Sequence, residues 1–362
     1  MPTINVPDYK GSSIVNLIST IETRLTGSSP NPLLYQNLEA AVPAAPGYVL
    51  VLFDGLGSGQ LEHPAAHVIR QARVADIDTV FPSTTTVALA SIATGLTPAE
   101  HGLLGYQMWI PEIEKVANTI KWTTLWGKPL DYNTESLLPT PNLWERLTAF
   151  GIDTFTVQPA HFDRSSLTKA LYRGCRFEPV ATTDQIVSIA KSLAGPGKLV
   201  VVYVPNVDFA AHVHGQDSEE YAATLQVAAS IWEGLVNKMP DDVAIVGTSD
   251  HGHIDFKPDA QHEIPKELQR NRIFYGDGRA MFVLGNGEEI AGLLPATWIP
   301  IDDAIEWWGT GFHHPSLATR APDGILLAED NALLLHQFSD DRMIGNHGGM
   351  TAAEQTVPLL IG

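Results

Sequence analysis

Short runs of apolar, often β-branched residues recur along the chain, and turn-forming residues bound most of them. Runs of this kind are typical of strands that are buried on both faces of a parallel sheet. The pattern predicts strands over residues 47–53 (GYVLVLF), 152–158 (IDTFTVQ), 198–204 (KLVVVYV), 243–249 (VAIVGTS) and 280–285 (AMFVLG).

Helical patterns lie between these runs. Residues 12–25 place apolar side chains at helical spacing after a serine, and residues 142–151 end in glycine, as helices often do. Residues 218–239 form a long amphipathic pattern with acidic residues in its first turn. Strands that alternate with helices predict an α/β fold with a doubly wound, mostly parallel sheet flanked by helices.

Two regions interrupt the alternation. Residues from about 107 to 140 hold tryptophans among polar residues and prolines, and residues from about 253 to 340 form a mixed segment. Long irregular segments inside a compact domain often cover a functional site. We therefore expect a single α/β domain over residues 1–362, with cap insertions at about 107–140 and 253–340.

The net charge of −19 narrows the range of partners. Nucleic-acid polymers and anionic membranes are themselves negatively charged, so neither is expected as a partner, and a phosphate-bearing substrate would need a cation other than Lys or Arg. Cys175 is the one cysteine, no run of eighteen apolar residues occurs, and the first residues lack a signal-peptide pattern. These features favour a cytoplasmic protein without a membrane span.

Aspartate and histidine side chains recur where the predicted strands end. The carboxyl ends of parallel strands meet at one edge of the sheet, which is where such sheets bind ligands. Taken singly, each residue could be a turn former, a helix cap or half of an ion pair. The candidates are Asp54, Asp208, His212, Asp250, His251 and, in a glycine-containing loop, His347. Mixed oxygen and nitrogen donors suit Zn²⁺, with Mn²⁺ also open, and this number suits two ions rather than one tetrahedral site.

A row of hydroxyl side chains, residues 83–86 (STTT), follows Pro82 and precedes an apolar helical pattern that ends at Gly95. One hydroxyl is expected to cap the free N–H groups of the helix. Another hydroxyl, at the positive end of the helix dipole and beside a metal, would be stabilised as an attacking alkoxide. The row therefore holds the candidate nucleophile.

At this point the sequence resembles a known family. Its segments LVLFDGLG, FPSTTTVALASIATGLTPAEHG, YVPNVDFAAHVHG, VGTSDHGH and GNHGGMTAAEQTVPLLIG occur in the order found in the alkaline phosphatase superfamily. They are most similar to its type I phosphodiesterase / nucleotide pyrophosphatase family. The resemblance runs from about residue 47 to the C-terminus and leaves the middle insertions unmatched.

The resemblance implies a role for each motif residue. A first ligand set would hold one zinc ion, and a second ligand set would hold the other. The first set is Asp54, Asp250 and His251, and the second is Asp208, His212 and His347. Thr85 would be the nucleophile, since it lies nine residues before Thr94 of the threonine–glycine pair, although Thr84 and Thr86 are only one residue away.

The implied reaction is hydrolysis of phosphodiester or pyrophosphate bonds in small, nucleotide-type substrates, through a phosphothreonine intermediate. His101 is interpreted as structural support, and His214 and His253 as groups that could support the ligands. Tyr106 lies at about the position where the family usually has a phosphate-binding asparagine, so it is the predicted substrate-binding residue.

Several alternatives stay open. Thr86 stands where nucleotide pyrophosphatases commonly have an aromatic residue, which weakens the case for nucleotides. No Arg or Lys occurs between Arg73 and Lys115, which favours diesters over monoesters. A phosphomonoesterase, a phosphonate hydrolase, a non-catalytic zinc-binding protein and self-association all remain open. The 22 Lys and Arg residues argue against a phosphosugar mutase, and the sulfatase motif is missing.

Overall fold

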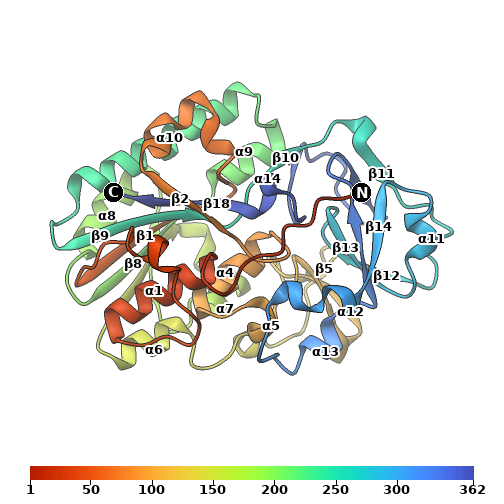
Figure 1. The fold of residues 1–362 in the computed structure, drawn as a ribbon, viewed down its shortest axis with the longest axis horizontal. Helices are drawn as coiled ribbons and strands as arrows, with labels where there is room; N and C mark the ends of the chain where they lie inside the picture. Colours follow the sequence, from red (N-terminus) through yellow and green to blue (C-terminus); the bar gives the residue numbers. More distant parts are fainter.

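The computed structural model describes residues 1–362, except for the side chain of Glu135. Figure 1 shows a large lobe with helices on both sides of a sheet and, beside it, a smaller lobe that contains β11, β12, β13 and β14. In the described residues, no helix combines the length and the hydrophobicity needed to cross a bilayer.

The main sheet has the strand order β2-β18-β9-β1-β8-β6-β7. Its strands are β1 (Gly47–Phe53), β2 (Arg73–Asp78), β6 (Asp153–Pro159), β7 (Arg176–Val180), β8 (Lys198–Val204), β9 (Val243–Ser249) and β18 (Thr356–Ile361). The strands from β9 to β7 run parallel, and β18 runs antiparallel to both β2 and β9.

Helices cover both faces of this sheet (Figure 1). Leu50 and Leu52 of β1 pack in one hydrophobic core and Val49 and Val51 in another, as the alternation of side chains along a strand requires. The first core includes α1 (Ile14–Thr26), α4 (Thr85–Thr94), α6 (Leu143–Ala149) and α7 (Ser166–Leu171). The second includes α3 (His67–Gln71), α8 (Asp184–Leu193), α9 (Asn206–His214) and α10 (Glu219–Lys238). The prediction of a doubly wound, mostly parallel α/β fold is confirmed.

A second sheet has the order β14-β15-β13-β12-β3-β4-β5 and is antiparallel throughout. Its strands are β3 (Gln107–Ile110), β4 (Lys115–Asn118), β5 (Thr123–Thr124), β12 (Ile273–Gly276), β13 (Ala280–Leu284), β14 (Ala296–Pro300) and β15 (Gly324–Ala328). The two regions that interrupt the predicted alternation thus contribute to one sheet, joined where Gly276 of β12 pairs with Gln107 of β3.

The strand predicted at residues 280–285 exists as β13, but its assignment to the parallel sheet is wrong. β13 runs antiparallel between β12 and β15. Phe282 packs in the first core and Met281 in a separate core of the smaller lobe. Because both faces are buried, the strand has the same continuous apolar pattern as a parallel-sheet strand.

Shorter elements connect these parts. The remaining helices are α2 (Gln36–Glu39), α5 (Pro98–His101), α11 (Glu288–Ala291), α12 (Ile301–Ala304), α13 (Leu317–Arg320) and α14 (Ala352–Gln355). The remaining strands are β10 (Ile254–Asp255), β11 (Gln261–Glu263), β16 (Leu333–Leu335) and β17 (Gly345–Asn346). Turns of 3-10 helix occupy Gln60–Glu62, Pro64–Ala66, Pro111–Ile113, Thr134–Ser136, Ala160–Phe162, Pro258–Ala260 and Ile305–Trp308.

Candidate metal centre and nucleophile

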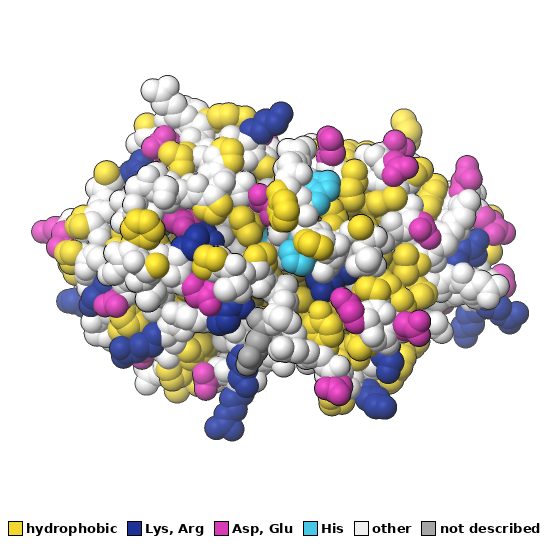
Figure 2. Space-filling model, turned by 90° about the horizontal axis from the view of Figure 1, so that it is seen from below, with side chains coloured by type: hydrophobic (Ala, Val, Ile, Leu, Met, Phe, Trp, Pro, Cys, Tyr) yellow, Lys and Arg dark blue, Asp and Glu magenta, His cyan; other side chains and the backbone are white. Residues whose placement is uncertain are grey.

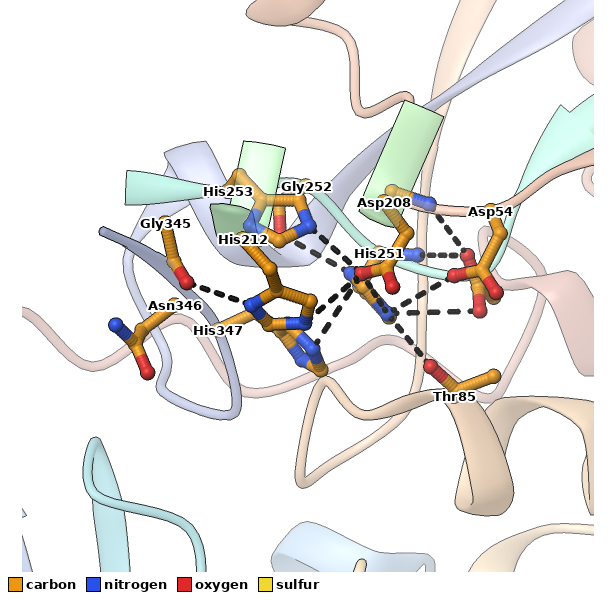
Figure 3. A network of polar contacts seen from close by, with 12 residues as sticks. Asp54, Thr85, Asp208, His212, His251, Gly252, His253, Gly345, Asn346 and His347 are labelled. Carbon is orange, nitrogen blue, oxygen red and sulfur yellow. Dashed lines mark hydrogen bonds and ion pairs between the residues drawn. The ribbon is translucent and has the colours of Figure 1, made fainter. Parts of the chain in front are cut away.

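The predicted ligands meet at the carboxyl ends of β1, β8 and β9 (Figure 3). Asp54 follows β1, and Asp250 and His251 follow β9. Asp208 and His212 lie one turn apart on α9, directly after β8, and His347 follows β17. This edge is where an open α/β sheet places its ligands.

In the first ligand set, unpaired oxygen atoms face a shared nitrogen. Asp54 Oδ1 and Asp250 Oδ2 are buried and have no hydrogen-bond partner. Each lies 3.5 Å from Nε2 of His251. Zinc–ligand bonds of 2.0–2.2 Å would separate two ligands of a tetrahedral site by about 3.4 Å. The donor set therefore fits a divalent cation.

The other oxygen atoms of these carboxylates are held by the protein. Tyr203 donates its hydroxyl to Asp54 Oδ2, and the backbone N–H of Gly55 donates to Asp250 Oδ1 at 3.0 Å. Burial, together with the carboxylates of Asp250 and Asp208, raises the pKa of Asp54 well above its usual range. Carboxylates crowded in this way are stabilised by a cation bound between them.

The second ligand set surrounds Asp208. Nε2 of His212 lies 3.2 Å and Nε2 of His347 lies 3.8 Å from Asp208 Oδ1. Nδ1 of His212 is 2.6 Å from the carbonyl oxygen of Gly345, and Nδ1 of His347 is 2.8 Å from that of Ser83. A histidine that donates Nδ1–H to a carbonyl keeps Nε2 free for a metal, and metal-ligating histidines usually have this arrangement.

Charge in this set is balanced differently from the first. Burial alone would raise the pKa of Asp208, but His212 and His253 hold it well below its usual range. Burial alone would lower the pKa of His212, but Asp208 raises it to about 9. The metal-free site therefore contains a histidine–aspartate ion pair, and a cation would take the place of the histidine proton.

His253 also reaches Asp208, with its Nε2 2.8 Å from Oδ1. By distance alone it groups with Asp208, His251 and His347 as a candidate metal cluster. Its Nδ1, however, is buried without a partner, so the proton that it donates to Asp208 is on Nε2. His253 is therefore better suited to holding Asp208 in place than to replacing His212 as a ligand.

Two other histidines lie outside the ligand sets. His101 is fully buried, with Nε2 3.0 Å from the Ser91 hydroxyl and Nδ1 accepting from the Leu103 N–H. Burial lowers the pKa of His101 to about 3, so it is a neutral structural residue. The suggestion that His214 supports the ligands is wrong, because it is exposed at the end of α9.

The row of hydroxyls serves purposes other than capping. Thr84 is the N-cap residue of α4 but makes no side-chain cap hydrogen bond, so the expected cap is wrong. Ser83 instead donates to the Gly349 carbonyl at 2.8 Å and accepts from the Gly348 N–H at 3.1 Å, which fixes the loop after His347. Thr85 Oγ1 lies 3.1 Å from Nε2 of His251, within the first ligand set.

Comparison with known proteins agrees with this arrangement. The model of the type I phosphodiesterase / nucleotide pyrophosphatase family matches residues 48–275, more than half of the chain. The chain belongs to this family. The family and its structural neighbours are hydrolases of phosphodiester, pyrophosphate or phosphonate bonds, and its superfamily is metal-dependent. A search of curated proteins found no significant match.

Solved structures show the same fold at low sequence identity. Murine ectonucleotide pyrophosphatase / phosphodiesterase 5 is 18% identical with a TM-score of 0.65, covering 86% of this chain and 87% of that chain. An inactive form of it in complex with AMP has a TM-score of 0.64, 18% identity and the same coverage. Phosphonoacetate hydrolase from Sinorhizobium meliloti 1021, in complex with phosphonoacetate, is 17% identical with a TM-score of 0.65, covering 88% and 91% of the two chains.

In this phosphodiesterase-family chain, Tyr106 lines a cavity together with Thr85, the candidate nucleophile, and Asn118 contacts Tyr106. Asn118 Nδ2 donates to the Tyr106 hydroxyl at 2.7 Å. The Asn118 Oδ1 accepts from the N–H groups of Ile120 and Lys121, which fixes the orientation of the amide. The Tyr106 hydroxyl is therefore an acceptor from Asn118, and its own proton is free to donate to a substrate oxygen.

Two cavities adjoin the candidate nucleophile, and Thr85, Ile120 and Asp208 line both. The polar cavity, of about 330 Å³, is lined by Tyr106, Lys121, Tyr275, Asp277, His336 and Phe338 among others. The apolar cavity, of about 250 Å³, includes Leu89, Phe162, Leu171, Tyr172, Tyr203 and Phe209. On one face of the molecule, hydrophobic side chains lie beside histidine side chains (Figure 2).

Sequence reasoning did not identify Asn118 or Asp277 as members of this site. Asn118 ends β4 and Asp277 follows β12, both in the second sheet. No motif marks either residue. Asp277 lines the same cavity as Thr85, and Asn118 contacts Tyr106 of that cavity; their position there depends on the pairing of β3 with β12. Only the three-dimensional structure identifies these two residues as part of the site.

Proposed function

We propose that this protein is a phosphodiesterase that cleaves phosphodiester or pyrophosphate bonds of small, nucleotide-type substrates, with Thr85 as its nucleophile. The two ligand sets would each hold a zinc ion, or Mn²⁺ in its place. The observation that carries the proposal is the position of the Thr85 hydroxyl, which lies 3.1 Å from Nε2 of His251. The unpaired carboxylate oxygens of Asp54 and Asp250 lie near the same nitrogen. Bound dications would lower the pKa of a hydroxyl there and offset the charge of the phosphate.

The residues of the chain would carry the reaction in two displacements. Thr85 Oγ, having lost its proton to solvent, forms a bond to phosphorus while the bond to the leaving oxygen breaks. That oxygen takes a proton from water. A water molecule then attacks the phosphothreonine, which restores the Thr85 hydroxyl and releases a phosphomonoester. The N-terminus of α4, where Thr85 is the first residue, favours the negative charge of these states.

Tyr106 would orient the phosphoryl group. Its free hydroxyl proton can donate to a non-bridging oxygen, and the hydrogen bond from Asn118 Nδ2 holds the ring in place. A neutral donor of this kind suits a diester, which carries one negative charge, better than a monoester dianion.

The two cavities also support diesters over monoesters. A diester has an organic group on each side of phosphorus, and Thr85 lines two cavities that could each take one of these groups. The apolar cavity suits an aromatic group such as a nucleobase, since the rings of Phe162 and Tyr203 lie 6.1 Å apart along its lining. A monoester would leave one cavity empty.

The test is hydrolysis of bis(p-nitrophenyl) phosphate, p-nitrophenyl phosphate and phosphonoacetate by the full chain, before and after chelation. We expect turnover of the diester to be lost with chelator, to return with about two equivalents of Zn²⁺ or Mn²⁺, and to exceed the monoester in kcat/KM at least 10-fold. Full activity in metal-free protein would refute the metal requirement. A preference for the monoester or the phosphonate would replace the proposed substrate class by that one.

A further inference from the structure

A third cavity, of about 250 Å³, lies on the second sheet beside the polar cavity. None of the described residues that line it is Thr85 or a member of a ligand set. Both regions that interrupt the predicted alternation contribute to its lining, which includes Trp109, Lys115 and Trp126 from the first and Arg272, His336 and Phe338 from the second. Because aromatic rings make up much of this lining, we call it the aromatic cavity.

Two of the aromatic rings in this lining are exposed to solvent. Trp126 is 64% exposed and Phe338 is 42% exposed. Their ring centroids lie 5.5 Å apart with the planes tilted by 51°, although one ring follows β5 and the other follows β16. His336 and Phe274, also in the lining, stack with their centroids 6.3 Å apart. Exposed aromatic surface beside a cavity is unfavourable in water, and a ring bound there would cover it.

The charge around the aromatic cavity has the opposite sign to that of the whole chain. Lys115 and Arg272 line it, and Glu114 is the only acidic residue among the described lining residues. Lys115 is exposed, and its ammonium group makes no ion pair. Arg272 donates to two backbone carbonyl oxygens, and its acidic partner Glu289 lies 3.4 Å away and is 63% exposed. In a chain with a net charge of −19, two cations beside one anion favour a negatively charged ligand.

We propose that the aromatic cavity binds a flat aromatic ring that carries a negative charge, such as an aromatic carboxylate. Trp126 and Phe338 would pack against the ring, and Lys115 would bind its charged group. The inference goes beyond the proposed function, because binding here needs neither Thr85 nor metal ions. His336 and Phe338 line the polar cavity as well. The ring is therefore either the far end of a long substrate or a separate small molecule, and the experiment distinguishes these two sources.

The test uses two fluorescent probes with the same ring system. Anilinonaphthalene sulfonate is anionic, and N-phenylnaphthylamine lacks the sulfonate group. In fluorescence titrations of the metal-replete, full-length protein, Trp126→Ala should weaken the binding of both probes about 10-fold. Lys115→Met should weaken the anionic probe about 5-fold and leave the neutral probe unchanged. Phe209→Ala is the matched control, because Phe209 is also 64% exposed but lines the apolar cavity, and it should change neither affinity.

Unchanged binding of the anionic probe in Trp126→Ala, or equal effects of Lys115→Met on the two probes, would overturn the inference. Weakening by Phe209→Ala instead of Trp126→Ala would place the probe in the apolar cavity and would also overturn it. Both side chains changed in the cavity are exposed, so the variants should fold, and their urea unfolding midpoints check this.

Kinetics with bis(p-nitrophenyl) phosphate then identifies the source of the ring. If the anionic probe raises KM alone, and Trp126→Ala relieves this inhibition, the ligand reaches into the polar cavity as the far end of a substrate would. If the probe binds without changing KM, the cavity is a separate site for a small molecule. Should the diester not be cleaved at all, the proposed function fails, and the titrations still decide the inference.

Discussion

The hydroxyl oxygen of Thr85 lies 3.1 Å from Nε2 of His251, although 166 positions separate the two residues in the chain. Thr85 is held there because it begins α4, whose buried side chains pack against the main sheet. His251 is held by the end of β9 and is completely buried. Two rigid elements therefore fix the distance between the candidate nucleophile and a candidate metal ligand.

Replacing Thr85 by alanine should abolish diester hydrolysis. Removing a nucleophile typically costs several orders of magnitude in kcat, and we expect a loss of at least about 10³-fold. Thr85→Ser should keep measurable activity because it keeps the hydroxyl. The measurement is steady-state hydrolysis of bis(p-nitrophenyl) phosphate, with zinc content determined for each variant so that metal loss is separated from loss of the nucleophile.

Thr86→Val provides the control for this experiment. Thr86 is fully buried and shares a 3.1 Å hydrogen bond with Thr119, away from the ligand sets. The change should cost about 1 kcal/mol of stability and leave kcat within a few-fold. If Thr86→Val were inactive while Thr85→Ala kept full turnover with both metals bound, the nucleophile would have been placed one residue too early.

Tyr106→Phe should lower kcat/KM for the diester about 10-fold, the worth of one lost hydrogen bond to a charged group. Asn118→Ala should lower it through the same contact, since Asn118 Nδ2 orients the Tyr106 hydroxyl. The double variant should then be little worse than Tyr106→Phe alone. Additive losses in a double-mutant cycle would show instead that the two residues act separately.

The main sheet could be predicted because its central strands are buried on both faces and have continuous apolar sequences. The edge strand β7 has the sequence RFEPV, and its polar residues and proline conceal it. The second sheet was not predicted as a sheet, because its strands are short and its central pairing joins β3 to β12, which lie far apart in the chain. A pairing between strands so far apart in the chain produces no local sequence pattern from which it could be predicted.

The same contrast applies to the site. Asp54, Asp250 and His251 directly follow strands of the main sheet, so their convergence could be inferred from the topology of parallel sheets. Asp277, which lines a cavity with Thr85, and Asn118, which contacts Tyr106 of that cavity, are brought there by the second sheet. The site residues that could not be predicted from the sequence therefore belong to the second sheet, not to the predicted metal ligands.

His101 should make the stability of the protein depend on pH. Its pKa is about 3 in the folded chain because of burial, against about 6.5 when unfolded. Between these values the unfolded chain binds the extra proton, so stability is complete above pH 6.5 and is lost as the pH falls. Between pH 7 and pH 5 the contribution of this one residue is about 2 kcal/mol.

His101→Gln should remove this contribution while keeping a side chain that can hydrogen bond. Urea unfolding of chelated protein at pH 7 and pH 5 measures it, because the other histidines then contribute equally to both proteins. We expect the variant to be less stable at pH 7 but to lose about 2 kcal/mol less on acidification. Equal losses in both proteins would contradict a buried, neutral His101.

A buried ion pair links the smaller lobe to the loop that carries His347. Arg279 and Glu354 are each at most 1% exposed, with Nε and Oε1 3.0 Å apart. Glu354 also accepts from the Gly349 N–H at 2.9 Å and from the Thr351 hydroxyl at 2.8 Å. The pair therefore fixes the backbone just after His347, a member of the second ligand set.

Glu354→Gln should leave the Arg279 charge buried without a counter-charge, which typically costs 3–5 kcal/mol, and we expect about that loss in urea unfolding. Because the loop after His347 loses its anchor, zinc titration of the folded variant should show a weakened second ion, with the first bound as before. Arg342→Met is the control, since the Arg342–Asp340 pair is exposed on the arginine side and should hardly affect the unfolding midpoint or zinc binding. Equal weakening of both zinc ions would mean that the pair supports the whole sheet edge rather than the His347 loop.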